Sequence, residues 1–350
     1  MIKNMITKIL VILLILAGSE AFRSSFIRSR SCSLSMRAIS PRKALFFEIV
    51  ETGLKERYEN EEASRIFKFC QYAKNELDSP VSIVKGHEPC EEYIDKLTPQ
   101  PWWPHEQFDW VDSLNEQSPK IRNELEAVLA AEAEQTFKGD SRYQETMGLG
   151  WTAFRLQRLG EWNEENMAKF PITTSIIKSL NIPLAVRGVM FAKQAPGTGV
   201  QPHSDGRNFI LTAHLGLKVP KQQSNDDNND QCWIEVAGKR RGWEEDKTIV
   251  FDTSFTHCTA NDSNDDRYVL IIDFWHPELT STEQKALEYI YDCRNKFETG
   301  KAASIDSPYI INGGTLDEEE FVKSKKSFGE DFINFWKDGG LVKFNPMQKR

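Results

Sequence analysis

The chain has 350 residues, enough for one large or two small domains with a sizeable buried core. Its formal net charge of −8 offers no electrostatic support for a nucleic-acid partner. Nine Trp and 21 Phe favour a folded globular protein and exclude a largely disordered one.

The first forty residues have the pattern of a targeting segment. Lysines precede a short apolar run, residues 9–17, and small residues follow it. That order is typical of a secretory signal peptide, because the run is too short to span a bilayer comfortably. Residues 22–43 then contain no Asp or Glu but many Ser and Arg, as in organelle transit peptides. Together they predict a presequence, residues 1–41, that resembles the two-part presequences of proteins reaching the plastid by the secretory route.

Other destinations remain open for this segment. A signal peptide alone would deliver the protein to the endoplasmic reticulum or the outside of the cell. If the apolar run 9–17 were retained instead of cleaved, it would anchor the chain to a membrane. A membrane partner is therefore expected only in that last case.

Helical patterns follow in the region 42–145. Apolar residues recur at helical spacing over 42–77 and again over 118–137. A short helix is predicted over 174–180, with Thr173 as its N-cap.

The sequence pattern changes at Leu184, where short runs rich in Val, Ile and Phe begin to alternate with clusters of turn-forming residues. These runs predict strands over 184–192, 209–217, 232–236, 248–252 and 267–275. Their spacing predicts a mainly β fold with flanking helices, and a sandwich or jelly roll over 146–280. A last helix follows Pro277, capped by Thr280 or Ser281, and opens a C-terminal helical extension, 281–350.

The six cysteines are not spaced like zinc ligands. Cys32 falls in the presequence, and the other five show no tight pairing in sequence. We expect buried free thiols, with at most one disulfide.

Three residues in the strand-rich part of the chain are of types that could together bind one metal ion. His203 and Asp205 are separated by one residue, and alternate residues of a strand point to the same side. His257 lies in another strand-like stretch further along the chain. Two imidazoles and one carboxylate on one face of iron(II) leave positions open for oxygen and an organic co-substrate. The pattern predicts that His203, Asp205 and His257 bind the metal and form the catalytic centre.

Arg267 begins the strand that follows His257. Its guanidinium could form a bidentate salt bridge with a carboxylate of the co-substrate. The alternative is an ion pair with Asp265 or Asp266, although a surface pair of that kind contributes little to stability.

The motifs around these residues resemble the aspartyl/asparaginyl β-hydroxylase family. They are Pro-His-Ser-Asp at 202–205, His-Leu-Gly-Leu at 214–217, Phe-Asp-Thr-Ser-Phe-Thr-His at 251–257 and Asp-Phe-Trp-His-Pro-Glu-Leu at 273–279. Pro-Trp-Trp at 101–103 and Trp-Thr-Ala-Phe at 151–154 are similar to the family's upstream segments. The order and spacing are specific and cover about half of the chain.

The resemblance implies a double-stranded β-helix oxygenase that uses iron(II), 2-oxoglutarate and O2. His203 and His257 match the family's metal-binding histidines, and Arg267 matches the arginine that binds the distal carboxylate of 2-oxoglutarate. His214 matches a histidine that contacts the other end of this co-substrate. Simple burial of His214 in an alternating strand is an equally good interpretation.

Several positions depart from the family's pattern. Asp205 stands where the vertebrate protein-modifying members have Gly. Ile210 and Thr212 stand where those members have arginines, which weakens the expectation of an acidic peptide side chain as substrate. Ala192 replaces a serine that helps to hold the co-substrate.

The sequence therefore predicts a 2-oxoglutarate-dependent dioxygenase that hydroxylates a carbon of a peptide side chain or of another substrate, such as a lipid acyl chain or a small metabolite. A jelly-roll binding protein without turnover is one alternative, but no ligand residue has been lost. A metal-dependent hydrolase is the other, but it would need a general base near the metal, and none is evident.

Overall fold

The computed structural model describes residues 41–78, 80, 84–90, 92–137, 150–158, 160–220 and 231–299. Apart from Pro41, the predicted presequence lies outside these residues. Residues 221–230 and residues 300–350 of the predicted C-terminal extension also lie outside them.

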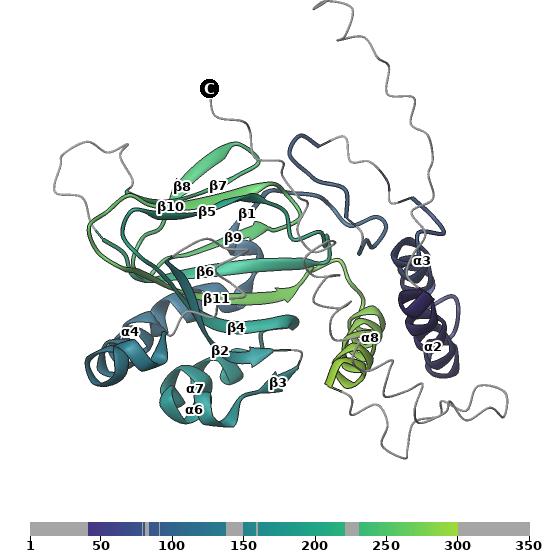
Figure 1. Cartoon of the computed structure of the whole chain (residues 1–350), viewed down its shortest axis with the longest axis horizontal. Coiled ribbons are helices and arrows are strands. Elements are labelled where there is room, and N and C mark those ends of the chain that lie inside the picture. Colours follow the sequence, from purple (N-terminus) through teal and green to yellow (C-terminus); the bar gives the residue numbers. More distant parts are fainter. Residues whose placement is uncertain are drawn as a thin grey trace, which may run out of the picture. The chain divides into compact units, whose positions relative to one another are not determined.

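Two antiparallel sheets form the centre of the fold (Figure 1). The larger has the order β1 (Trp102–Trp103), β9 (Thr248–Asp252), β6 (Ile210–Lys218), β11 (Arg267–Trp275), β4 (Leu184–Gln194), β2 (Trp151–Arg158) and β3 (Glu161–Trp162). The smaller has the order β5 (Thr198–His203), β10 (His257–Asn261), β7 (Cys232–Val236) and β8 (Lys239–Gly242).

From β4 to β11 the chain passes repeatedly between the sheets. β4, β6, β9 and β11 belong to the larger sheet, and the strands between them belong to the smaller one. This winding is that of a double-stranded β-helix, so the predicted jelly roll with flanking helices is confirmed. β1 lies in the region predicted as helical, 42–145, and adds an edge strand to the sheet of the predicted barrel region.

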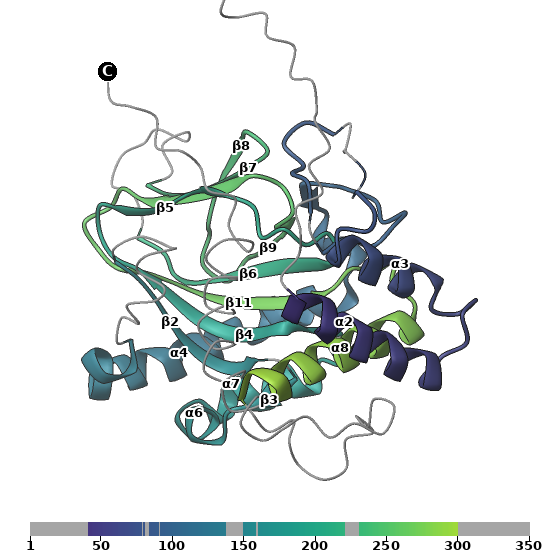
Figure 2. The same cartoon turned by 45° about the vertical axis from the view of Figure 1, so that its right-hand side comes forward.

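The larger sheet is buried on both faces. On β11, Val269 and Ile271 pack in an apolar cluster between the two sheets, whereas Leu270 and Ile272 pack in another cluster beneath helices. Those helices are α4 (Asp109–Thr136) and α7 (Pro171–Ser179), which cover one side of the larger sheet (Figure 2). Because both faces are covered, every residue of β11 is buried, and the strand is almost continuously apolar.

A further helical layer packs beside the sheets. It consists of α2 (Pro41–Arg57), α3 (Ser64–Ala73) and α8 (Ser281–Thr299), whose apolar faces meet Phe209 and Trp275. The predicted stretch 42–77 is therefore two helices. The predicted start of α8 is confirmed by a capping box, in which Thr280 Oγ1 accepts from the Glu283 N–H at 3.2 Å and Glu283 Oε2 accepts from the Thr280 N–H at 2.9 Å.

Two other helix predictions need correction. The helix predicted over 118–137 begins earlier, at Asp109, because Val111 and Leu114 extend its buried apolar face. Thr173 is not the N-cap of α7, which begins at Pro171. The carboxylate of Glu124 on α4 accepts instead from the backbone N–H of Ile172 at 2.7 Å and of Thr173 at 2.8 Å. A side chain from another helix therefore satisfies the first turn of α7.

The cysteines within the described residues are free, so the structure contains no disulfide among Cys70, Cys90, Cys232, Cys258 and Cys293. All but Cys258 are buried, as expected of ordinary core thiols. Within the same described part of the chain, no helix combines the length and the hydropathy needed to cross a membrane.

Candidate active site

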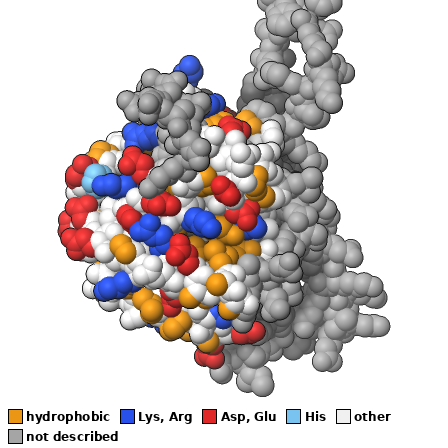
Figure 3. Space-filling model, turned by 90° about the vertical axis from the view of Figure 1, so that its left-hand side faces the viewer, with side chains coloured by type: hydrophobic (Ala, Val, Ile, Leu, Met, Phe, Trp, Pro, Cys, Tyr) orange, Lys and Arg blue, Asp and Glu red, His pale blue; other side chains and the backbone are white. Residues whose placement is uncertain are grey.

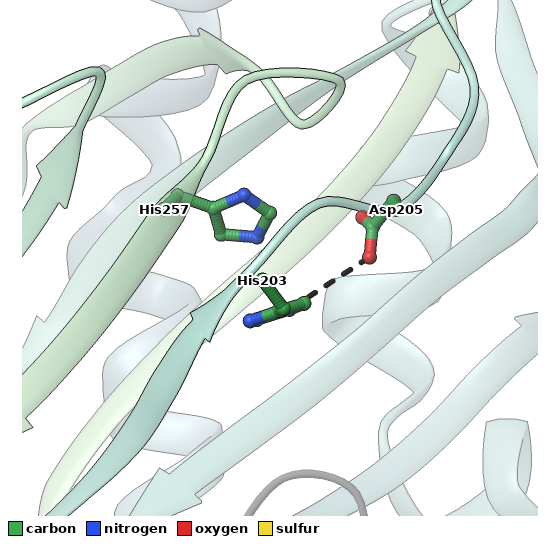
Figure 4. Close-up of side chains that lie close together, drawn as sticks. All are labelled: His203, Asp205 and His257. Atoms are coloured by element: carbon green, nitrogen blue, oxygen red, sulfur yellow. Dashed lines mark ion pairs between the residues drawn. The ribbon is translucent and has the colours of Figure 1, made fainter. Parts of the chain in front are cut away.

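The three predicted ligands meet at neighbouring ends of β5 and β10. His203 is the last residue of β5, His257 is the first of β10, and the two are direct partners in the antiparallel register. Their ring centroids are 4.2 Å apart, and Asp205 Oδ1 lies 3.8 Å from His203 Nε2. One ligand atom from each of the three residues lies within 4.8 Å of the others (Figure 4). The structure thus brings together all three residues that the sequence proposed.

Backbone carbonyls orient both imidazoles. The Nδ1 atom of His203 lies 2.8 Å from the Gln201 carbonyl oxygen, and that of His257 lies 2.8 Å from the Phe255 carbonyl oxygen. A hydrogen bond from Nδ1–H to each carbonyl leaves the lone pair on Nε2 for a metal. Burial, followed by the neighbouring His203, lowers the pKa of His257 to about 4, so this imidazole is neutral at physiological pH. Neutral imidazoles are the form that binds metal ions.

Asp205 reaches the site by a route that the sequence did not predict. β5 ends at His203, so the carboxylate is not aimed by strand alternation. Its loop is held instead by a hydrogen bond from the Asp205 N–H to the Thr253 carbonyl oxygen at 2.9 Å. Thr253 precedes His257 by a short loop, so this bond ties the two ligand-bearing segments together.

Arg187 on β4 holds the Asp205 side chain and was not among the predicted site residues. One nitrogen of its guanidinium contacts Asp205 Oδ2. The other nitrogens contact the fully buried Asp273 at 2.9 and 3.1 Å and Thr212 Oγ1 at 3.3 Å. Burial would favour a neutral Asp205 carboxyl, but the charge of Arg187, assisted by both histidines, holds the pKa of Asp205 well below its usual range. Asp205 is therefore ionised and has its second oxygen, Oδ1, on the histidine side.

The sequence contains a signal for Arg187. It is the only charged residue between Leu184 and Phe191, in a run otherwise made of apolar residues and Gly188. A charge in such a strand requires a buried counter-charge. The sequence does not say that Asp205 and Asp273 provide it.

Arg267 lies inside the barrel and has no carboxylate partner among the residues that the structure describes. The residue is 2% exposed, and within that part of the chain its Nε and Nη1 atoms have no hydrogen-bond partner. The guanidinium carbon lies 4.1 Å from the ring centroid of Trp243, a cation–π contact. The alternative pairing with Asp266 is not formed, since that carboxylate binds Lys193 at 2.7 Å. Burial lowers the pKa of Arg267 to about 10, which still leaves it charged at neutral pH.

A series of ring contacts through His214 connects Arg267 with the three candidate ligands. Its ring is stacked with Trp243 at a centroid distance of 6.0 Å and touches the edge of Phe251 at 4.9 Å. Phe251 is in turn 6.0 Å from His257. His214 is buried, its Nδ1 has no hydrogen-bond partner, and burial together with the charge of Arg267 lowers its pKa well below the usual value.

This arrangement fits an iron(II) ion with a bound dicarboxylate. The three ligand residues present two imidazole nitrogens and a carboxylate oxygen, a donor set suited to iron(II). An unpaired buried guanidinium is costly, and an anionic ligand would offset that cost. Trp243, which contacts both Arg267 and His214, was missed because an isolated Trp in a turn region carries no chemical signature.

Comparisons with known proteins identify the family. The family model described as "Aspartyl/Asparaginyl beta-hydroxylase" matches residues 115–277. The mouse protein "Aspartyl/asparaginyl beta-hydroxylase" is 31% identical over 56% of this chain, which spans only 26% of that relative's length. The "Ornithine lipid ester-linked acyl 2-hydroxylase" of Rhizobium tropici is also 31% identical over 56% of this chain, and the match covers 68% of that relative.

Among solved structures, a Trichoplax adhaerens prolyl hydroxylase in complex with a hypoxia inducible factor peptide fragment is 14% identical to this chain. The match covers 50% of this chain and 94% of that one, with a TM-score of 0.34. The Rhizobium relative is 31% identical and is matched over more than two thirds of its length, and the family model matches residues 115–277. The chain belongs to the aspartyl/asparaginyl β-hydroxylase family.

Proposed function

We propose that the protein is an iron(II)- and 2-oxoglutarate-dependent dioxygenase that hydroxylates a carbon of its substrate. The observation that carries the proposal is the pairing of two features in one barrel: a cluster of three ligand residues and, beyond His214, a buried guanidinium with no carboxylate. A metal-binding protein needs only the first feature, whereas a 2-oxoglutarate oxygenase needs both.

Each residue has a separate task in this proposal. His203, Asp205 and His257 hold the metal, and Arg267 binds the distal carboxylate of 2-oxoglutarate. His214 and Trp243 shape the space between them and exclude water. When bound, iron(II) and 2-oxoglutarate supply the oxidising chemistry that transfers an oxygen atom from O2 to carbon. The remaining work of the chain is to keep one face of the site open and to orient the substrate.

The alternative functions are less well supported. A binding protein without turnover would not need to keep an unpaired buried Arg267, because that residue costs stability. For a hydrolase, neither Asp205 nor Asp273 is suited to act as a general base. Asp205 and Asp273 are both paired with Arg187, which removes their basicity.

For the substrate, a peptide side chain is our first proposal, because the mouse relative is named for hydroxylation of aspartyl and asparaginyl groups. A lipid acyl chain is the second candidate, because the Rhizobium relative is equally similar. A structural observation also supports an acyl chain as substrate. The guanidinium of Arg187, which lies near Thr212, is already paired with Asp205 and Asp273. An acidic side chain would have to compete with these two carboxylates.

The test is succinate release from 2-oxoglutarate with iron(II) and O2, with peptides and acyl lipids offered in parallel. We expect stimulation by one of the two substrate classes, and hydroxylation of that substrate by mass spectrometry. No iron-dependent turnover of 2-oxoglutarate under any condition, with the metal bound, would contradict the proposal.

Asp205 is expected to be a true metal ligand. The Asp205→Gly variant should bind iron(II) at least about tenfold more weakly, a loss reached even when only a hydrogen-bonding partner of a ligand is removed. Anaerobic titration of the apoprotein measures this directly, with thermal unfolding as the check that the variant is folded. Unchanged iron affinity would mean that two histidines suffice here, as in the family members that have Gly at this position.

A further inference from the structure

A segment outside the barrel lies along both ligand-bearing loops. We call it the strap: residues 84–90 and 92–97, between α3 and β1. On the His257 side, the N–H of Thr256 donates to the Gly86 carbonyl oxygen at 2.8 Å, and the N–H of Glu88 donates to the Ser254 carbonyl oxygen at 3.1 Å. The Thr256 hydroxyl also donates to the Glu88 carboxylate at 2.5 Å. The strap is thus bonded to the residue directly before His257.

The strap continues to the loop that carries Asp205. The N–H of Glu92 donates to the Gly206 carbonyl oxygen at 3.4 Å. Ile94 and Asn208 exchange two hydrogen bonds: the Ile94 N–H donates to Asn208 Oδ1 at 2.9 Å, and Asn208 Nδ2 donates to the Ile94 carbonyl oxygen at 2.8 Å. The strap therefore supports the backbone next to Asp205 and His257, two of the three candidate ligands.

Glu92 fixes the strap to the C-terminal helix α8. Its Oε2 accepts from Arg207 Nε and from the Tyr291 hydroxyl, both at 2.6 Å, and its Oε1 accepts from Arg294 Nη2 at 2.7 Å. All four residues are buried, at 5% exposure or less. Arg207 in turn donates to the Asp205 carbonyl oxygen at 3.5 Å. The connection runs from α8 through Glu92 and Arg207 to the main chain of a ligand residue.

The charge of Glu92 is what makes this connection rigid. Burial favours its neutral form, but the charges of Arg294 and Arg207 outweigh burial and hold the pKa of Glu92 well below its usual range. A buried carboxylate between two arginines forms charge-assisted hydrogen bonds, which are the stronger ones. A neutral amide at this position would keep the shape but lose the counter-charge for both arginines.

We propose that Glu92 is a positioning residue for the metal site, acting through Arg207 on the loop from Asp205 to Asn208. The proposal rests on the metal site of the proposed function. It adds that the iron affinity of the barrel depends on a carboxylate that does not face the barrel and touches none of the ligands.

The test uses the Glu92→Gln variant of the full chain, loaded anaerobically with iron(II) and, separately, with cobalt(II). We expect iron affinity to fall by about 10- to 100-fold, the usual effect of losing an outer partner of a ligand. We also expect the visible spectrum of bound cobalt(II) to change, because that spectrum reports the ligand geometry. Both readings are made at a temperature where unfolding curves show the variant to be folded.

Glu283→Gln is the matched control. Glu283 is equally buried, at 3% exposure, and its carboxylate binds Arg65 at 2.6 and 2.5 Å, joining α8 to α3. Its hydrogen-bond partners lie in neither ligand-bearing loop. We expect this variant to lose thermal stability while keeping the iron affinity and the cobalt spectrum of the parent.

The outcomes separate cleanly. Glu92→Gln protein with the parent's iron affinity and spectrum would overturn the proposal, as would an equal loss of affinity in Glu283→Gln. If Glu92→Gln does not fold, Tyr291→Phe can replace it, because this variant removes only one of the hydrogen bonds to Glu92. We expect it to lose less iron affinity than Glu92→Gln would. Iron affinity equal to the parent's in Tyr291→Phe would overturn the proposal. Parent protein that binds no iron would instead refute the proposed function itself.

Discussion

The Arg267→Ala variant is expected to bind 2-oxoglutarate far more weakly while binding iron(II) almost as well as the parent. The guanidinium is buried against Trp243 and has no carboxylate partner in the barrel, so the co-substrate would supply it. Losing one member of such a desolvated charge pair costs about 2–5 kcal/mol, roughly a thirtyfold to several-thousandfold loss of affinity. Titration of 2-oxoglutarate into the manganese-loaded variant measures the effect.

Arg267→Lys separates charge from shape. An ammonium keeps the positive charge but lacks the planar fork that matches a carboxylate, so this variant should recover only part of the affinity. The loss of an exposed ion pair often changes affinity very little. If the affinity of Arg267→Ala for 2-oxoglutarate stayed within about twofold of the parent's, the co-substrate would be bound by other residues.

Replacing His203 or His257 by alanine is expected to abolish iron-dependent turnover while the fold survives. In the proposed site each histidine would supply one of three ligands, and each ring also donates to a backbone carbonyl. Leaving that carbonyl unpaired costs about 1–3 kcal/mol, less than the stability of a typical domain. Succinate release and manganese titration measure the loss, and circular dichroism checks the fold.

His105→Ala is the control for these variants. The side chain of His105 is 45% exposed, and its charged neighbours are also on the surface. Its removal should leave both metal binding and turnover unchanged. Near-normal succinate production by either ligand variant would show that the metal is held by other residues.

The strands that the sequence predicted are β4, β6, β9 and β11 of the larger sheet and β7 of the smaller one, because burial makes them apolar. β11 and β4 carry almost continuous apolar runs, which report a strand covered on both faces. β5 and β10 carry the ligands but are short and polar, with sequences Thr-Gly-Val-Gln-Pro-His and His-Cys-Thr-Ala-Asn. Their strand character comes from pairing with each other, which composition does not reveal.

The same distinction explains what could be predicted of the site. His203, Asp205, His257 and Arg267 were proposed from their chemical types and spacing, and His214 was proposed from the family resemblance. Arg187, Trp243 and Glu92 were not, because their roles depend on contacts between residues remote in sequence. The network around Glu92 spans from Glu92 to Arg294, and nothing local to either residue indicates it.

The placement of Arg187 between two carboxylates affects which residues of the site can be exchanged during evolution. An arginine with a single buried partner would be left uncompensated by the loss of that partner, and the change would be strongly destabilising. Arg187 also contacts Asp273 at 2.9 Å and Thr212 at 3.3 Å, and neither of these contacts involves Asp205. A lineage can therefore exchange Asp205 for Gly without first repairing the barrel, whereas loss of Asp273 removes the contact that fixes the arginine on its own strand pair. The two aspartates are thus expected to differ in how well they tolerate substitution: folding should depend less on Asp205, which lies beside His203, than on Asp273.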